Sequence, residues 1–290
     1  EATPEEKAVL EQFSGWGGLS DAFEPNKDSW HSEYTELKSL LTEEEYAAAR
    51  SSTLTAFYTP PEVIDAMYTT LRKMGVGAGT ILEPSMGAGA FFGQSHSYLY
   101  EPTTRLFGVE LDSLTGRIAR QLYQKANIQI TGFEKADLPD SFFDVVIGNV
   151  PFGDYSVVDP QYNRLHFKIH DYFFAKSIDK LRTGGIIAFI TTSGTLDKKS
   201  EEVRRYINAR CDFIGAVRLP DSTFKSAGTK AMADIIFLQK RDRILEQDAS
   251  WLHTTQTEDG LSLNSYFAEH PEMVCGTLKT VSGPYGPTLT

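Results

Sequence analysis

Short apolar runs alternate along the chain with longer segments in which apolar residues recur every three or four positions. The runs predict strands at 80–83, 105–110, 127–131, 143–148, 185–192, 212–218 and 233–239. The longer segments predict helices at 90–98, 112–125, 170–182 and 198–209. Strands that alternate with helices are typical of an α/β fold with a mostly parallel sheet covered on both faces. The last two strands have no clear helix between them, so we expect a final hairpin.

A further helix is expected to begin near Pro60. Thr59 and Glu62 have the spacing of a capping box, with Pro60 at the first helical position. The helical period is carried by Val63, Ile64, Met67 and Leu71.

The pattern divides the chain into three parts. Residues 1–54 form a helical N-terminal extension, with short polar helices at 3–13 and 42–50 and a glycine-rich turn that holds Trp16 as a packing anchor. Residues 55–243 form the α/β domain, and the structure of residues 244–290 is left open. The chain begins Glu-Ala-Thr-Pro without Met, so we treat it as a fragment of a longer protein.

Composition fits a globular domain, and charge complicates any interpretation as a DNA-binding protein. The 290 residues are 41% hydrophobic, with no long apolar run that predicts a membrane span and no secretory leader. Two distant cysteines give neither a metal pattern nor a disulfide framework, which favours a cytoplasmic protein. The net charge is −11, but residues 1–50 alone carry −8 and residues 195–243 carry +4. The acidity is therefore concentrated at the N-terminus.

A glycine-rich turn and a following acid predict a nucleotide site. The first strand runs into Glu83 and Pro84 and then into a turn with Gly87 and Gly89, where a ligand can approach bare backbone. Glu110 ends the second strand, where α/β folds place the carboxylate that holds ribose hydroxyls. NAD and S-adenosylmethionine both fit this spacing. Because a carboxylate at Glu83 would repel a pyrophosphate and attract an ammonium group, we favour S-adenosylmethionine.

The fourth strand ends in the most specific segment of the sequence, Asn149-Val150-Pro151-Phe152. The exocyclic amine of adenine is a poor nucleophile, and acceptors on its N–H groups both activate and position it. Asn149 offers an amide oxygen, and the adjacent backbone carbonyl offers a second acceptor. Pro151 stiffens the turn, and Phe152 offers a face on which a flipped base can stack. No metal is required.

These segments carry a family resemblance. The catalytic segment is similar to the Asn-Pro-Pro-aromatic motif of amino-methyltransferases, and the chain order resembles the γ class of N6-adenine DNA methyltransferases. Phe57-Tyr58-Thr59-Pro60-Pro61 resembles that family's leading Tyr-Thr-Pro-Pro segment. The Gly-Trp-Gly-Gly-Leu and Gly-Val-Glu-Leu-Asp segments resemble the methylase regions of large phage and conjugative-element helicase–methylase proteins. The fold then implied is the Rossmann-like class I fold of S-adenosylmethionine-dependent methyltransferases.

The resemblance also implies residue roles. Asn149, Pro151 and Phe152 would hold the target base, and Val150 stands where the family usually has Pro. Val still supplies the backbone carbonyl expected there, although rigidity is lost. The implied cofactor set is Tyr58, Thr59, Glu83, Pro84, Gly87, Gly89, Glu110 and Glu134.

Other conspicuous residues have structural interpretations. His166 and His170 lack companions for a metal site. Residues 171–174 are expected to begin a helix packed on the sheet. Lys198, Lys199, Arg204 and Arg205 are expected on a solvated helix face.

The predicted function is methyl transfer to N6 of adenine in DNA by direct attack of a flipped base. Two alternatives stay open: the same chemistry on RNA or on protein glutamine, and a degenerate module that only binds cofactor within a larger helicase-type protein. Residues 244–290 hold a single Lys and no Arg. We therefore expect weak DNA binding by this chain alone, target recognition by further domains or a partner subunit, and no membrane partner.

Overall fold

The computed structural model describes residues 1–290 except 14, 54–57, 78, 99–102, 225–231 and 284–285. The chain forms two compact units. Unit 1 comprises residues 1–137 with 224–229, and unit 2 comprises residues 138–223 with 230–290. The three-part division expected from the sequence, at 1–54, 55–243 and 244–290, places its boundaries elsewhere. That division stays a prediction.

All seven predicted strands are present in one sheet, in the order β3-β2-β1-β4-β5-β7-β6. They are β1 (Thr80–Glu83), β2 (Arg105–Glu110), β3 (Asn127–Ile130), β4 (Phe143–Asn149), β5 (Leu181–Thr192), β6 (Cys211–Leu219) and β7 (Ala233–Lys240). The pairs β1–β2, β2–β3 and β4–β5 are parallel, whereas β7 runs antiparallel to both β5 and β6. The mostly parallel sheet and the final hairpin are confirmed.

The strands of unit 1 are accompanied by three helices that the periodicity predicted and by one short helix, the last named below, that it did not. They are α4 (Pro61–Lys73), α5 (Ala90–Tyr98), α6 (Ser113–Leu122) and the short η3 (Phe133–Lys135). Helix α4 buries Ile64, Met67, Tyr68 and Leu71 on one face, close to the predicted stripe.

The predicted start of α4 is wrong by one residue. Pro60 is the N-cap and Pro61 is the first helical residue, and no side chain caps the helix end. The reason is the second proline: a residue that precedes proline is excluded from the helical region, and Pro60 has ψ 138°. Thr59 therefore lies one position too early to cap the helix, and its side chain is buried.

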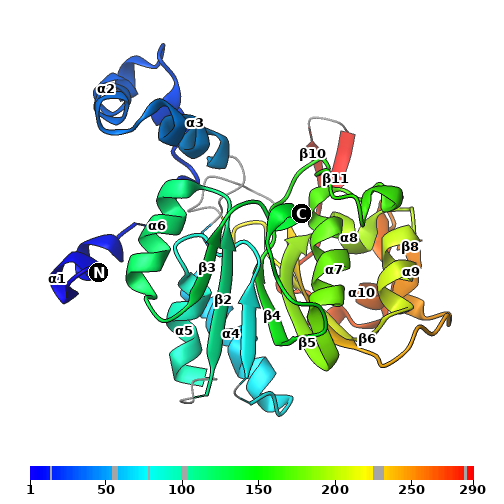
Figure 1. Ribbon diagram of the computed structural model, residues 1–290. Coiled ribbons are helices and arrows are strands. Elements are labelled where there is room, and N and C mark those ends of the chain that lie inside the picture. The colour runs from blue at the N-terminus through cyan, green and yellow to red at the C-terminus, as the bar shows by residue number, and fades with distance from the viewer. Residues whose placement is uncertain (14, 54–57, 78, 99–102, 225–231, 284–285) are drawn as a thin grey trace. The chain divides into compact units, whose positions relative to one another are not determined.

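The N-terminal extension packs as part of unit 1. It contains α1 (Pro4–Leu10), η1 (Ser20–Phe23), η2 (Asp28–Trp30), α2 (His31–Leu40) and α3 (Glu43–Ser52), of which α2 and both short helices were not predicted. Trp16, Phe23 and Tyr46 form its small core, which confirms Trp16 as a packing anchor. Leu114 of α6 packs against this core, and α1 lies beside α6 in Figure 1.

Unit 2 is built around α7 (Ile169–Lys180), which buries eleven of its twelve residues. The aromatic residues at its start lie in the core, as predicted. The short helix η4 (Asn163–Leu165) precedes α7, and the short helices α8 (Gly194–Asp197) and α9 (Glu202–Asn208) follow β5. The predicted helix at 198–209 is shorter than expected, since α9 covers only 202–208, and α8 was not predicted.

The C-terminal segment completes unit 2. It comprises η6 (Ser250–Leu252), β8 (Thr254–Gln256), β9 (Ser262–Asn264), α10 (Ser265–Glu269), η7 (Pro271–Met273), β10 (Thr280–Gly283) and β11 (Gly286–Leu289). Trp251 stacks on Phe213 of β6 at 4.5 Å between ring centroids. Its indole N–H also donates to Asn208 at 3.2 Å. Side chains of β6 and α9 therefore hold the segment in place.

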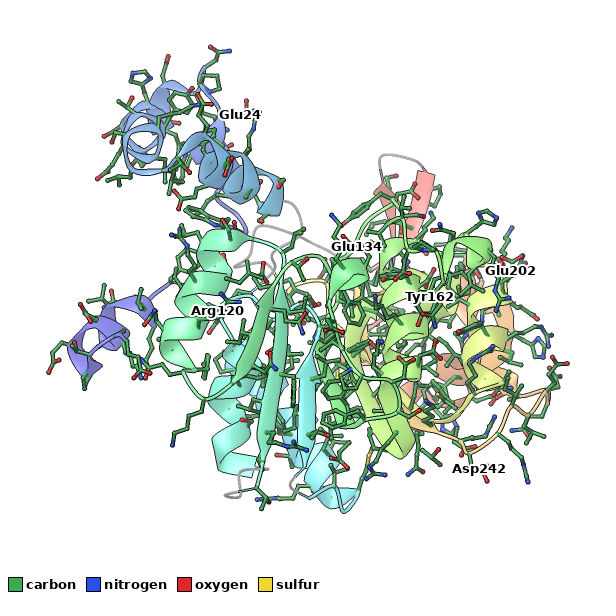
Figure 2. The ribbon with its side chains drawn as sticks, in the orientation of Figure 1. Glu24, Arg120, Glu134, Tyr162, Glu202 and Asp242 are labelled. Atoms are coloured by element: carbon green, nitrogen blue, oxygen red, sulfur yellow. The ribbon has the colours of Figure 1, made fainter. Side chains whose placement is uncertain are left out.

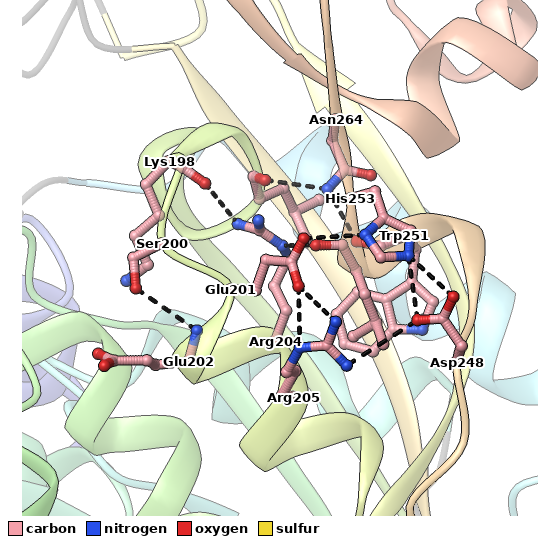
Figure 3. A network of polar contacts seen from close by, with 12 residues as sticks. Lys198, Ser200, Glu201, Glu202, Arg204, Arg205, Asp248, Trp251, His253 and Asn264 are labelled. Atoms are coloured by element: carbon pink, nitrogen blue, oxygen red, sulfur yellow. Dashed lines mark hydrogen bonds and ion pairs between the residues drawn. The ribbon is translucent and has the colours of Figure 1, made fainter.

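Figure 3 shows that Arg204 belongs to this attachment, which corrects the prediction of a solvated face. Arg204 is fully buried and donates to the backbone oxygens of Leu252, at 2.7 Å, and Lys198, at 2.8 Å. A guanidinium offers five donors in a fixed fork, so it can join two backbone segments at once. Arg205, on the same helix, is exposed as predicted and pairs with Glu201, and Lys199 is exposed as well.

Candidate functional site

Three predicted cofactor acids lie at one edge of unit 1. Glu83 is the last residue of β1, Glu110 is the last residue of β2, and Glu134 lies on η3, shortly after β3 ends. Because β1, β2 and β3 are parallel neighbours, their carboxyl ends lie at the same edge. Glu134, labelled in Figure 2, is half-buried on this short helix. The acids are therefore gathered where α/β folds bind ligands.

Glu83 is a buried carboxylate with one oxygen that can still accept a hydrogen bond. Its side chain is 2% exposed, and its Oε2 has no hydrogen-bond partner. Burial, and then the nearby charge of Glu110, hold the pKa of Glu83 well above its ordinary value. An unpaired buried carboxylate is costly, so a cationic or hydrogen-bond-donating ligand at this place would be strongly favoured.

Two backbone groups hold Glu110. The N–H of Gly87 donates to Oε2 and the N–H of Asp112 donates to Oε1, both at 2.8 Å. Burial raises the pKa of Glu110 to about 7, while the two backbone N–H groups oppose that rise. The geometry fixes the carboxylate against the glycine-rich turn, and the predicted contact with ribose hydroxyls stays a prediction.

The two glycines of the turn have different tasks. Gly87 and Gly89 both have positive φ, 54° and 93°. A Cβ on Gly87 would meet no atom within 4 Å, so the backbone there borders open space. A Cβ on Gly89 would instead collide with the ring of Tyr123. Gly87 thus leaves room beside Glu110, and Gly89 permits close internal packing.

The remaining cofactor candidates are less clearly placed. Thr59 is 4% exposed and Pro84 is buried, whereas Tyr58 is 39% exposed. Phe57, which completes the leading segment, lies outside the described residues. The contacts of Tyr58, Thr59, Pro84 and Glu134 with a cofactor therefore stay predictions.

The predicted catalytic segment belongs to unit 2. Asn149 is the last residue of β4 and pairs in register with Ile190 of β5. The N–H of Val150 then donates to the backbone oxygen of Ile190 at 3.0 Å, which extends the ladder by one residue. Pro151 and Phe152 leave the sheet and are half-buried. The segment is therefore anchored to β5 at Val150 and is partly exposed at Pro151 and Phe152.

Most described cations of residues 195–243 are engaged within the fold. Lys198 pairs with buried Asp171, Arg241 with Asp212, and Arg218 with both Asp197 and Asp234. The excess of basic residues in this stretch therefore overstates the charge available to a nucleic acid.

The residues that the structure describes contain neither a membrane-spanning helix nor a candidate metal site. None of their helices is long and apolar enough to cross a membrane. Within the same parts of the chain, no group of three or more His, Cys, Asp and Glu side chains is arranged to hold a metal ion.

Comparison with known proteins identifies the family. Residues 40–263 match the family described as N-6 DNA Methylase. The chain belongs to this family. The predicted resemblance to N6-adenine methyltransferases is thereby confirmed at the level of the family, whose methyl donor is S-adenosylmethionine.

Individual relatives agree with this membership. The chain is 27% identical over 208 residues to Defense against restriction protein B of Escherichia phage P1, which covers 70% of the chain but only 9% of that protein. A class I S-adenosylmethionine-dependent methyltransferase of Listeria monocytogenes has a similar structure, with a TM-score of 0.53 at 18% identity, covering 83% of this chain and 82% of that one. A type I restriction-modification methyltransferase subunit of Streptococcus thermophilus gives 0.55 at 20% identity, covering 73% and 53%. These structures confirm the Rossmann-like class I fold.

Sequence reasoning missed one residue at the sheet edge where the predicted cofactor acids lie, which we call the cofactor edge. Asp112 is 2% exposed, caps the N-terminus of α6 and supplies the N–H that holds Glu110. An Asp directly before a helical period is a common N-cap, and this feature could have identified it.

Proposed function

We propose that this chain is a catalytic domain that methylates the exocyclic N6 amino group of adenine in DNA, acting on a base flipped out of the duplex. The observation that carries the proposal is the Asn149–Phe152 segment, anchored at the end of β4, in a member of the N-6 DNA methylase family.

The residues of unit 1 fit the methyl donor. When bound, S-adenosylmethionine supplies an electrophilic methyl group on a positively charged sulfur. Glu110 would accept hydrogen bonds from the ribose hydroxyls, beside the open space at Gly87. Glu83, with its unpartnered Oε2, would face the ammonium group of the methionine moiety. Glu134 would accept from the adenine amino group.

In unit 2, Asn149 and the backbone carbonyl of Val150 would accept hydrogen bonds from the target amine. Both contacts orient the nitrogen lone pair and raise its nucleophilicity. The ring of Phe152 would stack on the flipped base. The ladder bond between Val150 and Ile190 supplies rigidity that the missing proline would otherwise give.

The decisive measurement is transfer of a tritiated methyl group to duplex DNA, RNA and protein by the chain and by its Asn149→Ala variant. We expect labelled N6-methyladenine in DNA, reduced by at least about 100-fold in the variant, the range for loss of one preorganised polar contact. Asn127→Ala, at an exposed position in β3, is the matched control and should keep full activity.

The other outcomes are informative. Label in RNA or in protein glutamine would mean that the chain performs the same methyl transfer on a different acceptor. Cofactor binding without transfer to any acceptor would indicate a non-catalytic module. Near-full turnover by Asn149→Ala would contradict the catalytic assignment itself.

Target recognition by another region is part of the proposal. The cations of residues 195–243 are largely engaged within unit 2, and the C-terminal segment holds one Lys. The phage relative is far longer than this chain. The chain alone should bind duplex DNA non-specifically, with a dissociation constant on the order of 10⁻⁴–10⁻⁶ M. Anisotropy titrations with candidate and scrambled duplexes at fixed salt would reveal any intrinsic sequence preference.

A further inference from the structure

We infer that Trp16 of the N-terminal extension is a positioning residue of the cofactor site and acts on Glu110 through Asp112. The inference rests on the proposed role of Glu110. It gives a task to the Gly-Trp-Gly-Gly segment, which the proposed chemistry does not use.

The hydrogen bonds form a continuous chain inside unit 1. The indole Nε1–H of Trp16 donates to Oδ2 of Asp112 at 3.2 Å, although 96 positions separate the two residues. The backbone N–H of Asp112 donates in turn to Oε1 of Glu110 at 2.8 Å. Trp16 and Asp112 are 7% and 2% exposed, so water competes little for these bonds.

Local structure explains how Trp16 reaches Asp112. Gly15 and Gly18 flank the tryptophan with φ of 95° and 79°, in the left-handed region that glycine adopts without strain. The ring packs edge-to-face against Phe13 and Phe23, at 5.4 and 5.7 Å between centroids. The turn and the aromatic cluster thus aim the indole N–H at one carboxylate oxygen.

Helix capping alone does not account for the Trp16 contact. Asp112 already caps α6, because its Oδ2 accepts from the backbone N–H of Thr115 at 2.9 Å and also from the Thr115 hydroxyl. The indole is a third donor to the same oxygen, and it comes from a different segment. Its effect is to restrain the Asp112 peptide, whose N–H determines where the carboxylate of Glu110 lies. The extension is therefore coupled to the cofactor edge.

The test is calorimetric titration of the full chain with S-adenosylmethionine. Trp16→Phe keeps an aromatic ring but removes the N–H donor together with the five-membered ring of the indole, and the dissociation constant should rise about three- to tenfold, the size of one lost hydrogen bond. Tyr46→Phe is the matched control: it removes the bond from the Tyr46 hydroxyl to the Phe23 carbonyl oxygen, at 3.3 Å, in the same aromatic cluster. It should leave the dissociation constant unchanged, even if both variants unfold at a lower temperature.

A double-mutant cycle separates positioning from a general structural role. Asp112→Ala should weaken binding, and adding Trp16→Phe should weaken it no further, because the two residues act in series. Asp112→Asn, which keeps an acceptor oxygen and the backbone N–H, should recover most of the affinity. Asp112→Ala also serves as the test if Trp16→Phe does not fold.

Two results overturn different statements. An unchanged dissociation constant in Trp16→Phe, or additive effects in the cycle, would overturn the inference while leaving the proposed function intact. No loss of affinity in Glu110→Ala would remove Glu110 from the cofactor site, and the proposed site would fail with it.

Discussion

The two units bury carboxylates in opposite ways. In unit 2, Asp234 accepts two hydrogen bonds from Arg218, at 2.8 and 2.9 Å, and Asp197 lies 2.8 Å from the same guanidinium. In unit 1, Glu83 is buried and Glu110 is half-buried, and among the described residues neither forms an ion pair with a cation. A buried carboxylate paired with arginine holds a fold together. An acid without a cationic partner, such as Glu83 with its unpartnered Oε2, is one that a ligand can complete, and this contrast separates the acids paired with arginine from the predicted cofactor acids.

The largest effect is expected from removing Arg218, the cation that pairs with Asp234 and Asp197. Arg218→Met would leave Asp234 buried without its partner, and burial already raises the pKa of Asp234 to about 6 against the opposing effect of Arg218. We expect the free energy of unfolding to fall by about 3–5 kcal/mol, the usual cost of removing one partner of a buried pair. Urea denaturation measures it. Arg205→Met, which breaks a surface pair with Glu201, is the control and should show no measurable change.

The second effect concerns Glu110 and appears as a dependence of cofactor affinity on pH. Burial raises the pKa of Glu110 to about 7, and ligand hydroxyls and amines bind its ionised form. Cofactor affinity should therefore rise as the pH increases from 6 to 8, with release of a proton on binding, which calorimetry in buffers of different ionisation enthalpy detects. Glu110→Gln should weaken binding at pH 8 by about 1–3 kcal/mol and flatten the profile. A profile of the same slope in the variant would assign the titration to another group.

The carboxyl of Glu110 also makes the stability of the fold depend on pH, but stability falls as the pH rises, whereas cofactor affinity increases. Because its pKa is raised in the folded state, the native protein binds more protons than the unfolded chain between about pH 4.5 and 7. Its contribution to stability is fully present below that window and is lost as the pH rises through it. Cofactor at saturating concentration should remove this loss, since binding favours the ionised form.

The sequence predicted the sheet well because burial on both faces leaves continuous apolar runs such as 185–192 and 233–239. It also located Glu83, Gly87 and Glu110, since turn chemistry and strand ends are local features. It failed where long-range contacts decide the outcome. Arg204 was predicted on the surface from its charge, whereas a carbonyl 48 residues away makes its burial favourable. Asp112 was missed because its importance comes from two partners, one of them 96 positions away.

The smallest expected effect tests how unit 2 holds its catalytic segment. The family usually has proline where this chain has Val150, and Val150 uses the N–H that proline lacks to reach Ile190 at 3.0 Å. Val150→Pro would remove this bond and leave the Ile190 carbonyl with one partner fewer, but proline would also restrict the unfolded chain. We expect a net loss of about 0.5–1.5 kcal/mol in stability, with cofactor affinity unchanged because the cofactor acids lie in unit 1. Val150→Ala measures the separate cost of trimming this side chain, which is only 1% exposed, because it keeps the N–H. If Val150→Pro were more stable and more active than the parent chain, the bond from Val150 to Ile190 would not be what holds Asn149 in place. Valine at this position would then weaken the segment and would not compensate for the missing proline.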